Sequence, residues 1–281
     1  MQLVQALALN ESVQSTRIEG TQVTFADMID DVAKRNKRSE VLEVTNYQKA
    51  LELGIDLIQA NNPITSRMIR RLHSELMSNN ARGTTSSAGE FRKVPNFIGP
   101  TNKIEDAVYI PIDANLIPEY ITNLEYYING ESHRTLKRSI SSNETLLDST
   151  TNPLLKIGII HAQFESIHPF LDGNGRMGRI LIVLAAMLFG VTDYPIFFVS
   201  EQLEKQRIRY YNALNGVRGA DPDWYTWLDF FISAVDLMTD ELLSKLKRID
   251  DLARKGMQLI GDKSTIKRIW LAMNHMLPFK K

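Results

Sequence analysis

Apolar residues recur along most of the chain at the three- and four-residue spacing that is typical of amphipathic helices. The segment 65–77 shows this spacing clearly, because its apolar positions fall on one face of a helix. These positions are Met68, Ile69, Leu72 and Leu76. The segments 152–167 and 179–190 are apolar on nearly every side, which predicts two helices in the centre of a bundle.

Further helices are predicted before and after these segments, over 24–37, 201–217 and 223–249. The first of them opens with Thr24 and Asp27, which have the spacing of a capping box. The hydrophobic pattern therefore predicts an all-α fold.

One region, 79–112, interrupts the helical pattern. Small and polar residues are followed there by residues typical of strands, with Pro and Gly between them. The interrupting residues are Pro95, Gly99, Pro100 and Pro111. We expect a loop and then a short β-hairpin, or flap. A second polar stretch, 130–152, is rich in Ser, Thr and Asn and predicts a surface loop.

The composition excludes several classes of function. The 281 residues contain no Cys, which excludes disulfides, thiol catalysis and Cys-based zinc sites. The net charge is zero, so no overall field favours nucleic acid or an anionic membrane. The longest apolar run, 180–191, is shorter than the ~20 residues of a membrane-spanning helix. With no secretory signal at the N-terminus, we expect a soluble cytoplasmic protein without a membrane partner.

The entrance to the apolar segment 179–190 has the features of an anion site. Gly173 and Gly175 allow the backbone to turn tightly and to approach an anion without a Cβ in the way. A helix that begins there would offer unpaired N–H groups and a partial positive charge. Arg176 and Arg179 are three residues apart, so two guanidinium groups on one helix face can grip phosphate oxygens.

Two further residues of the same loop indicate chemistry beside the anion. Asp172 is a hard oxygen ligand in the position where Mg²⁺ would accompany a phosphate. His168 has a side chain with a pKa suited to taking a proton from an incoming hydroxyl. A general base, a metal ligand and an anion-binding turn in one loop together favour phosphoryl or nucleotidyl transfer. The G-x-x-x-x-G-K-[ST] pattern of a P-loop is absent.

The stretch His168 to Arg179, "HPFLDGNGRMGR", resembles the signature H-P-F-x-[D/E]-G-N-G-R-x-x-R of the Fic family at every fixed position. The resemblance implies a helical core that transfers AMP from ATP, with Mg²⁺, to a Ser, Thr or Tyr hydroxyl of a protein. His168 would then be the general base and Asp172 the metal ligand. The remaining loop residues would hold the phosphates of ATP: Gly173, Asn174, Gly175, Arg176 and Arg179.

Two other segments are similar to parts of the family. "GEFRKVPNFIG" (89–99) looks like the flap that holds a target segment by strand pairing, with Glu90, Phe91 and Arg92 at the family's positions. "QRIRYYNALNGVR" (206–218) looks like the helix that faces the adenine. Tyr210, Tyr211 and Leu214 match there, whereas Asn215 and Arg218 stand where relatives carry other polar residues. The two tyrosines are equally compatible with a place in the core.

A fourth segment, "STRIEG" (15–20), is similar to the inhibitory pattern [S/T]-x-x-x-E-[G/N] of autoinhibited Fic proteins with an N-terminal inhibitory helix. The resemblance implies that Glu19 pairs with Arg179 in place of the γ-phosphate of ATP and misaligns the nucleotide. An alternative interpretation is that Thr16 and Glu19 form an ordinary capping box.

On this resemblance the chain divides into an N-terminal helical region (1–61), a Fic core (62–239) and a helical appendage (240–281) that is compatible with the start of a winged helix. Nucleic acid becomes a partner only if such a domain follows. The other partners are ATP and a target protein, with self-modification and a homodimer as further alternatives. Removal of AMP, or nucleotide sensing by a DNA-binding regulator, are the competing functions. His161 and Glu165 lie four residues apart, but their apolar surroundings favour a core histidine over a metal ligand.

Overall fold

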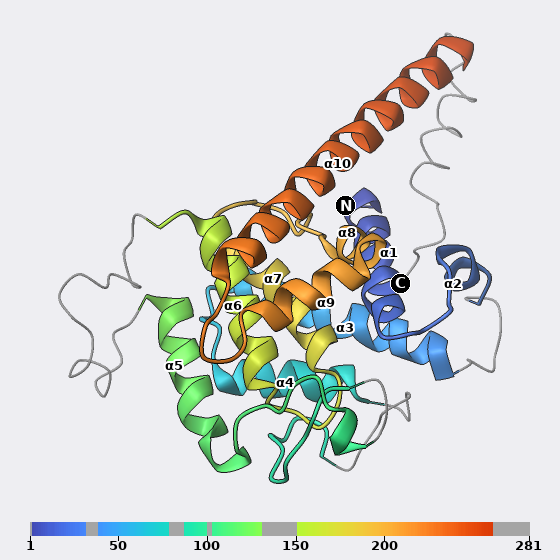
Figure 1. Cartoon of the computed structure of the whole chain (residues 1–281). Helices are drawn as coiled ribbons and strands as arrows, with labels where there is room; N and C mark the ends of the chain where they lie inside the picture. Colours follow the sequence, from blue (N-terminus) through green and yellow to red (C-terminus); the bar gives the residue numbers. More distant parts are fainter. Residues whose placement is uncertain (1, 32–38, 79–86, 100–102, 131–150, 261–281) are drawn as a thin grey trace.

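Two helices that are buried on almost every side form the centre of the molecule (Figure 1). They are α6 (Pro153–Ile167) and α7 (Asn174–Leu188), which pack against each other and are joined by the loop 168–173. The structure is a computed structural model that describes residues 2–31, 39–78, 87–99, 103–130 and 151–260. The prediction of two central helices from their apolar composition is confirmed.

The other helices surround this pair. The N-terminal half supplies α1 (Gln2–Ile18), α2 (Phe25–Asp31), α3 (Ser39–Gln59), α4 (Ser66–Leu76) and α5 (Ile117–Asn129). Short 3₁₀ turns, η1 (Ile104–Asp106) and η2 (Ala114–Leu116), precede α5. The C-terminal half supplies α8 (Ser200–Lys205), α9 (Arg207–Gly216) and α10 (Trp224–Ile260). Helices α3 and α4 contact α7, whereas α5 and α10 contact α6.

Local signals in the sequence fix several helix ends. At the start of α4 the Thr65 hydroxyl accepts a hydrogen bond from the Met68 N–H (3.2 Å), and the four apolar residues predicted to share a face are buried. At the start of α2 the predicted capping box is confirmed. The Thr24 N–H donates to Asp27 Oδ2 (2.9 Å), and the Asp27 N–H donates to Thr24 Oγ1 (3.2 Å).

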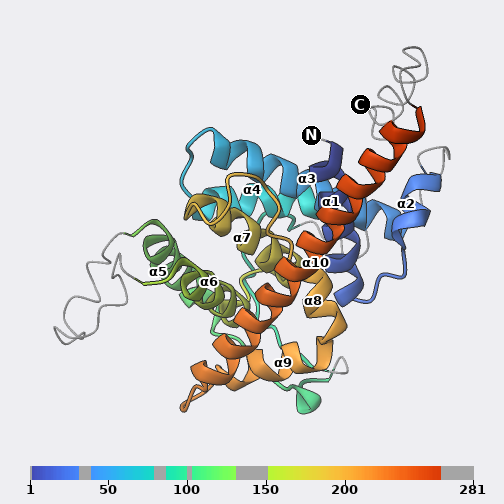
Figure 2. The same ribbon diagram turned by 90° about the horizontal axis from the view of Figure 1, so that it is seen from above.

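Packing overrides the sequence pattern in the C-terminal half. The helix predicted over 201–217 is interrupted at Gln206, where neither Gly nor Pro marks a stop, and α9 takes a new direction against α10. Helix α10 continues past the predicted end at 249 to Ile260 and projects beyond the core (Figures 1 and 2). Its first half carries buried residues such as Trp227, whereas Leu259 is 90% exposed. The expected winged-helix start lies partly in 261–281, outside the described residues.

The expected flap is less regular than predicted. In the described part of 87–112 the backbone forms one isolated antiparallel bridge, between Ile98 and Tyr109, rather than two strands. Pro95 and Pro111 lack the N–H group that a ladder needs, which accounts for the short pairing. Most of the predicted surface loop 130–152 lies outside the described residues.

The close contact of α6 and α7 depends on Gly178, which predicts the effect of Gly178→Ala. A Cβ there would overlap Glu165 Oε1 and lie 3.1 Å from His161 Cε1. We expect overpacking to lower the unfolding free energy by about 1–3 kcal/mol. The higher helix propensity of Ala would by itself raise the unfolding free energy by about 1 kcal/mol.

Urea unfolding followed by circular dichroism measures this difference. Gly216→Ala in α9 is the matched control, because the nearest atom to its new Cβ, Asp223 Cβ, is 3.9 Å away. The control should be neutral or stabilising. A Gly178→Ala protein as stable as wild type would contradict the packing.

Candidate active site

The loop between α6 and α7 is held in shape by its own Asn174. The Phe170 N–H donates to Asn174 Oδ1 (2.9 Å), and Asn174 Nδ2 donates to the Phe170 carbonyl (2.8 Å), both in the interior. The loop begins at His168 and ends at Gly173, whose φ angles of 49° and 77° turn the chain between the two helices. Residues 168–173 therefore meet the N-terminus of α7 as a rigid turn.

His73 of α4 supports this loop, and the sequence did not mark it as functional. Its ring stacks on Phe170 with 3.6 Å between centroids. Nδ1 accepts from the Gly89 N–H (2.9 Å), so we assign the proton to Nε2, which lies 3.0 Å from the Asp172 carbonyl oxygen. Burial lowers the pKa of His73 to about 4, which keeps the ring neutral. Within an amphipathic helix such a residue is indistinguishable by pattern from a core histidine.

Arg176 and Arg179, in the first turns of α7, are both buried, and Arg179 is paired with Ser15 and Glu19. Arg179 is 1% exposed and donates from Nε to Ser15 Oγ (2.7 Å) and from Nη2 to the Ser15 carbonyl (3.0 Å). Its Nη2 also lies 2.6 Å from Glu19 Oε1. The structure therefore brings together the two residues that the sequence motif connected.

The other arginine lacks close partners. Arg176 is 3% exposed, and its nearest carboxylates are those of Asp172 (3.5 Å) and Glu43 (4.0 Å). Its Nε and Nη1 are buried without a hydrogen-bond partner. Unpaired donors on a buried cation are costly, and the oxygens of a bound phosphate would satisfy them.

The Glu19 carboxylate occupies the entrance of α7. A Cβ added to Gly175 would overlap Glu19 Oε1 and lie 3.0 Å from Arg179 Nη1, so the carboxylate is in close contact with the predicted anion-binding turn. Packing around the carboxylate raises its pKa, but Arg179 outweighs this and holds the pKa below its ordinary value. The capping-box alternative is wrong, because Thr16 Oγ1 donates to the Ser12 carbonyl (2.9 Å) and Glu19 follows the end of α1.

His168 stands at the C-terminal end of α6. Burial, Arg218 and Arg92 lower the pKa of its imidazole to about 4, so the ring is neutral at pH 7. Its Nδ1 is buried without a hydrogen-bond partner. A neutral imidazole can accept a proton, as a general base must.

Asp172 is the one carboxylate at the turn itself, and it suits a metal that arrives with a nucleotide. Its side chain is 46% exposed, and Oδ1 accepts from the Gly173 N–H (2.6 Å). The described residues contain no group of three or more metal-ligating side chains. Mg²⁺ is commonly bound by one or two carboxylates together with substrate phosphates, so a single ligand beside the arginines fits.

The predicted adenine and flap residues have mixed surroundings. Tyr210 is 1% exposed and its hydroxyl lies 2.8 Å from Nε2 of the buried His161, so both belong to the interior. Tyr211 is half-buried under Arg207, which lies 5.9 Å from its ring centroid. In the flap, Glu90 pairs with Arg70, Phe91 packs against Phe170, and the buried Arg92 donates to backbone carbonyls.

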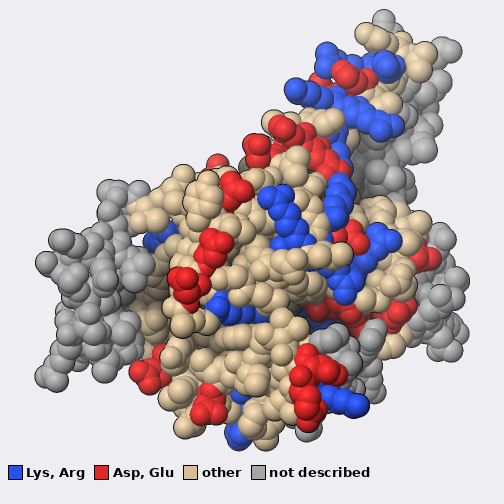
Figure 3. Space-filling view, in the orientation of Figure 1, with Lys and Arg blue, Asp and Glu red and all other residues tan. Residues whose placement is uncertain are grey.

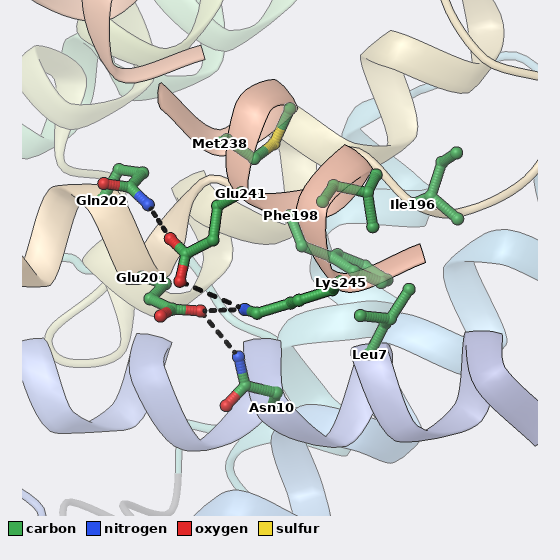
Figure 4. A pocket seen from close by; sticks show the side chains of 10 residues that line it. Leu7, Asn10, Ile196, Phe198, Glu201, Gln202, Met238, Glu241 and Lys245 are labelled. Carbon is green, nitrogen blue, oxygen red and sulfur yellow. Dashed lines mark hydrogen bonds and ion pairs between the residues drawn. The ribbon is translucent and has the colours of Figure 1, made fainter. Parts of the chain in front are cut away.

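A separate pocket lies between α1, α8 and α10, and ion pairs and hydrogen bonds connect several of the residues that line it (Figure 4). Lys245 Nζ lies 3.0 Å from Glu201 and 3.4 Å from Glu241, and Asn10 donates to Glu201 (3.1 Å). These bonds tie α1 to the C-terminal helices. On the face shown in Figure 3, acidic and basic side chains both occur along α10, so this helix presents no surface of a single sign there.

The fold and the site define a helical domain with two buried arginines in the first turns of α7, and comparisons with known proteins identify its family. The model of the "Fic/DOC family" matches residues 63–186, and that of the "Fic/DOC family N-terminal" matches 1–56. The chain therefore belongs to the Fic/DOC family. Within the described residues no helix combines the length and hydrophobicity needed to cross a membrane.

Individual relatives are distant. The protein adenylyltransferases Fic of Drosophila grimshawi and Drosophila melanogaster are 24% and 26% identical over 208 residues, 71% of this chain. The chain spans 36% and 35% of their lengths. A Fic family protein from Desulfovibrio desulfuricans shares the fold, with a TM-score of 0.68 and 21% identity over 87% of this chain and 66% of that one. Fic-1 (residues 134–508) from C. elegans gives 0.60 and 17%, over 86% and 63%.

Glu165 is buried near Arg179, and we predict that its carboxyl group makes the unfolding free energy depend on pH. Burial raises its pKa to about 7 from 4.5, against the opposing effects of Arg179 and Arg218. Because the folded-state pKa is the higher one, the stability associated with Glu165 is complete below pH 4.5 and is lost as the pH rises to about 7.

Glu165→Gln should remove this loss. Relative to wild type, the unfolding free energy of the variant should increase between pH 4.5 and about 7, by an amount on the order of 3 kcal/mol. Urea unfolding of both proteins at pH 5 and pH 8 measures the difference. A difference that is the same at both pH values would contradict the prediction.

Proposed function

We propose that the protein transfers AMP from ATP to a Ser, Thr or Tyr hydroxyl of a target protein or of itself. The observation that carries the proposal is a neutral His168 beside a turn with two buried arginines, one of which has unpaired donors. Nucleotidyl transfer requires a general base for the attacking hydroxyl and an anion-binding site for the phosphates beside it. The relatives named protein adenylyltransferase support this reaction class.

In the proposed mechanism the His168 imidazole takes the proton of the target hydroxyl. The hydroxyl oxygen forms a bond to the α-phosphorus of ATP, the bond from that phosphorus to the bridging oxygen breaks, and pyrophosphate leaves. The N–H groups at the start of α7 and the Arg176 guanidinium would stabilise the developing negative charge. Asp172 would hold Mg²⁺, which supplies further positive charge to the phosphates when bound.

We further propose that Glu19 restrains this reaction. Its carboxylate pairs with the guanidinium of Arg179 and occupies space next to Gly175 that a phosphate would need. An ATP molecule that binds without these contacts is not aligned for in-line attack, and misalignment can lower a rate by about 100-fold. The same carboxylate near the phosphates is also compatible with removal of AMP, so both directions need a test.

Glu19→Gly tests the proposed reaction and its restraint together. The glycine removes the carboxylate that pairs with Arg179, so we expect transfer of label from α-labelled ATP to protein to rise about 10–100-fold. Glu19→Gln should give a smaller rise, because it keeps the size of the side chain but not its charge. The control Glu19→Gly/His168→Ala should show no label.

Two results would count against the proposal. No label with any variant and a panel of proteins would contradict AMP transfer. Faster loss of AMP from premodified protein with wild type than with Glu19→Gly would instead assign the site to AMP removal.

Metal removal tests the role of Asp172. In the Glu19→Gly background, EDTA should abolish labelling, and Asp172→Asn should reduce it more than about 10-fold at limiting Mg²⁺. Part of the loss should return at higher Mg²⁺, since the phosphates supply the other ligands. Asp56→Asn, on the exposed side of α3, is the matched control and should retain full activity. Equal activity of both variants at every Mg²⁺ concentration would remove Asp172 from the site.

A further inference from the structure

Three side chains from outside α6 bind the carbonyl groups at its C-terminal end. Arg218 Nη2 donates to the Glu165 carbonyl (3.1 Å) and the Tyr109 hydroxyl donates to that of Ser166 (2.9 Å). Arg92 Nε donates to the carbonyl of His168 itself (2.9 Å). The last carbonyls of a helix have no partner within it, so these bonds fix where the helix ends.

The three donors come from two distant parts of the chain that meet at this point. Arg92 and Tyr109 belong to the flap region, whereas Arg218 follows α9. The Arg218 guanidinium lies over the Tyr109 ring, 4.2 Å from its centroid, and its Nη1 donates to Asn215 Oδ1 (2.7 Å). A cation stacked on an aromatic ring joins the flap to the end of α9.

We propose that Arg218, stacked on Tyr109, is a positioning residue for His168: it fixes the end of α6 and so the direction in which the imidazole faces a target hydroxyl. This role rests on the proposed function, in which His168 is the base. The sequence resemblance placed Arg218 only in the segment that faces the adenine, so a role at His168 is additional.

Stability alone is a weak explanation for this arginine. Its Nε is buried without a hydrogen-bond partner, and burial lowers the pKa of the guanidinium. A half-buried cation with a buried, unpaired donor gains less from its contacts, because its desolvation opposes them. An arginine at this point is better explained by its effect on the neighbouring His168.

The charge of Arg218 supplies a readout that a purely structural residue would lack. Burial has the largest effect on the pKa of the imidazole and lowers it. Four groups also act on it: Arg218 after α9, Arg92 in the flap, the Glu165 carbonyl of α6 and Glu19 after α1. The two arginines lower the pKa of His168, whereas the two oxygen groups raise it. Removing the charge at 218 should therefore raise the pKa of His168 toward its ordinary value, so that a higher pH is needed to deprotonate the base.

The test compares Arg218→Gln and Arg218→Lys, with Arg209→Gln as the matched control. Arg209 is an exposed cation of α9, the helix that precedes Arg218, and its guanidinium lies near Phe230 rather than α6. Titration of His168 by NMR reports its pKa without any need for AMP transfer. Arg218→Gln should raise that pKa by about one pH unit, while Arg218→Lys and Arg209→Gln should leave it unchanged.

Kinetics in the Glu19→Gly background complete the test. Arg218→Gln should move the rising limb of the pH–rate profile to higher pH. Arg218→Lys should lower kcat about tenfold with little change in the KM for ATP, since lysine lacks the planar fork that binds the Glu165 carbonyl and Asn215 at the same time. If Arg218→Gln does not fold, full kcat in Arg218→Lys would still overturn the proposal.

The outcomes separate the two proposals. A folded Arg218→Gln protein with an unshifted His168 pKa overturns the positioning role. A shifted pKa in a protein that transfers no AMP supports the electrostatic effect of Arg218 on His168 and counts against AMP transfer alone.

Discussion

The structure depends on a cation that is buried in one of its two central, largely apolar helices. Arg179 is 1% exposed in α7, where nearly every neighbour in the helix is apolar. An unpaired charge in such a place would be strongly destabilising, so an anion has to lie beside it. In the structure that anion is Glu19, 2.6 Å away. On the proposed function, ATP supplies a competing anion to the same guanidinium.

This requirement explains how the N-terminal region is attached to the rest of the molecule. Glu19 must lie against Gly175, so α1 packs along α3 and α8 and brings Ser15 onto Arg179. Glu11 extends the attachment, since it accepts hydrogen bonds from Ser200 at the start of α8 and from the Tyr47 hydroxyl. Residues 1–56, which match the N-terminal model of the family, contain the α1 and α3 side of this attachment.

The sequence predicted the parts of the fold that local patterns determine. The apolar central helices, the face of α4 and the capping box of Thr24 and Asp27 follow from spacing and from hydrogen bonds within a few residues. The break at Gln206 and the continuation of α10 to Ile260 did not follow, because they depend on packing between distant segments.

The same distinction holds at the site. The turn 168–173 and the start of α7 could be predicted to lie together because their residues are adjacent in the chain, and the chemical roles of these residues stay predictions. His73 and Arg218 were not assigned their contacts, because they reach the loop and the end of α6 only through the fold. The predicted flap strands are not confirmed in the described residues for a third reason: the prolines that marked the flap also remove the donors that strand pairing needs.

The way Glu19 is held determines how a restraint on this site can be released. The residues that anchor α1 are deep in the interior, since Ser15 and Thr16 are 0% exposed, whereas the Glu19 side chain is 35% exposed. Glu19 also follows the last residue of α1, so its side chain can rotate without breaking a helical hydrogen bond. Exchange of one anion for another at Arg179 therefore requires movement of a single side chain, while Ser15 keeps its two bonds to the guanidinium. On the proposed function, such a restraint would respond to the competition between a carboxylate and a phosphate and would leave α1 folded.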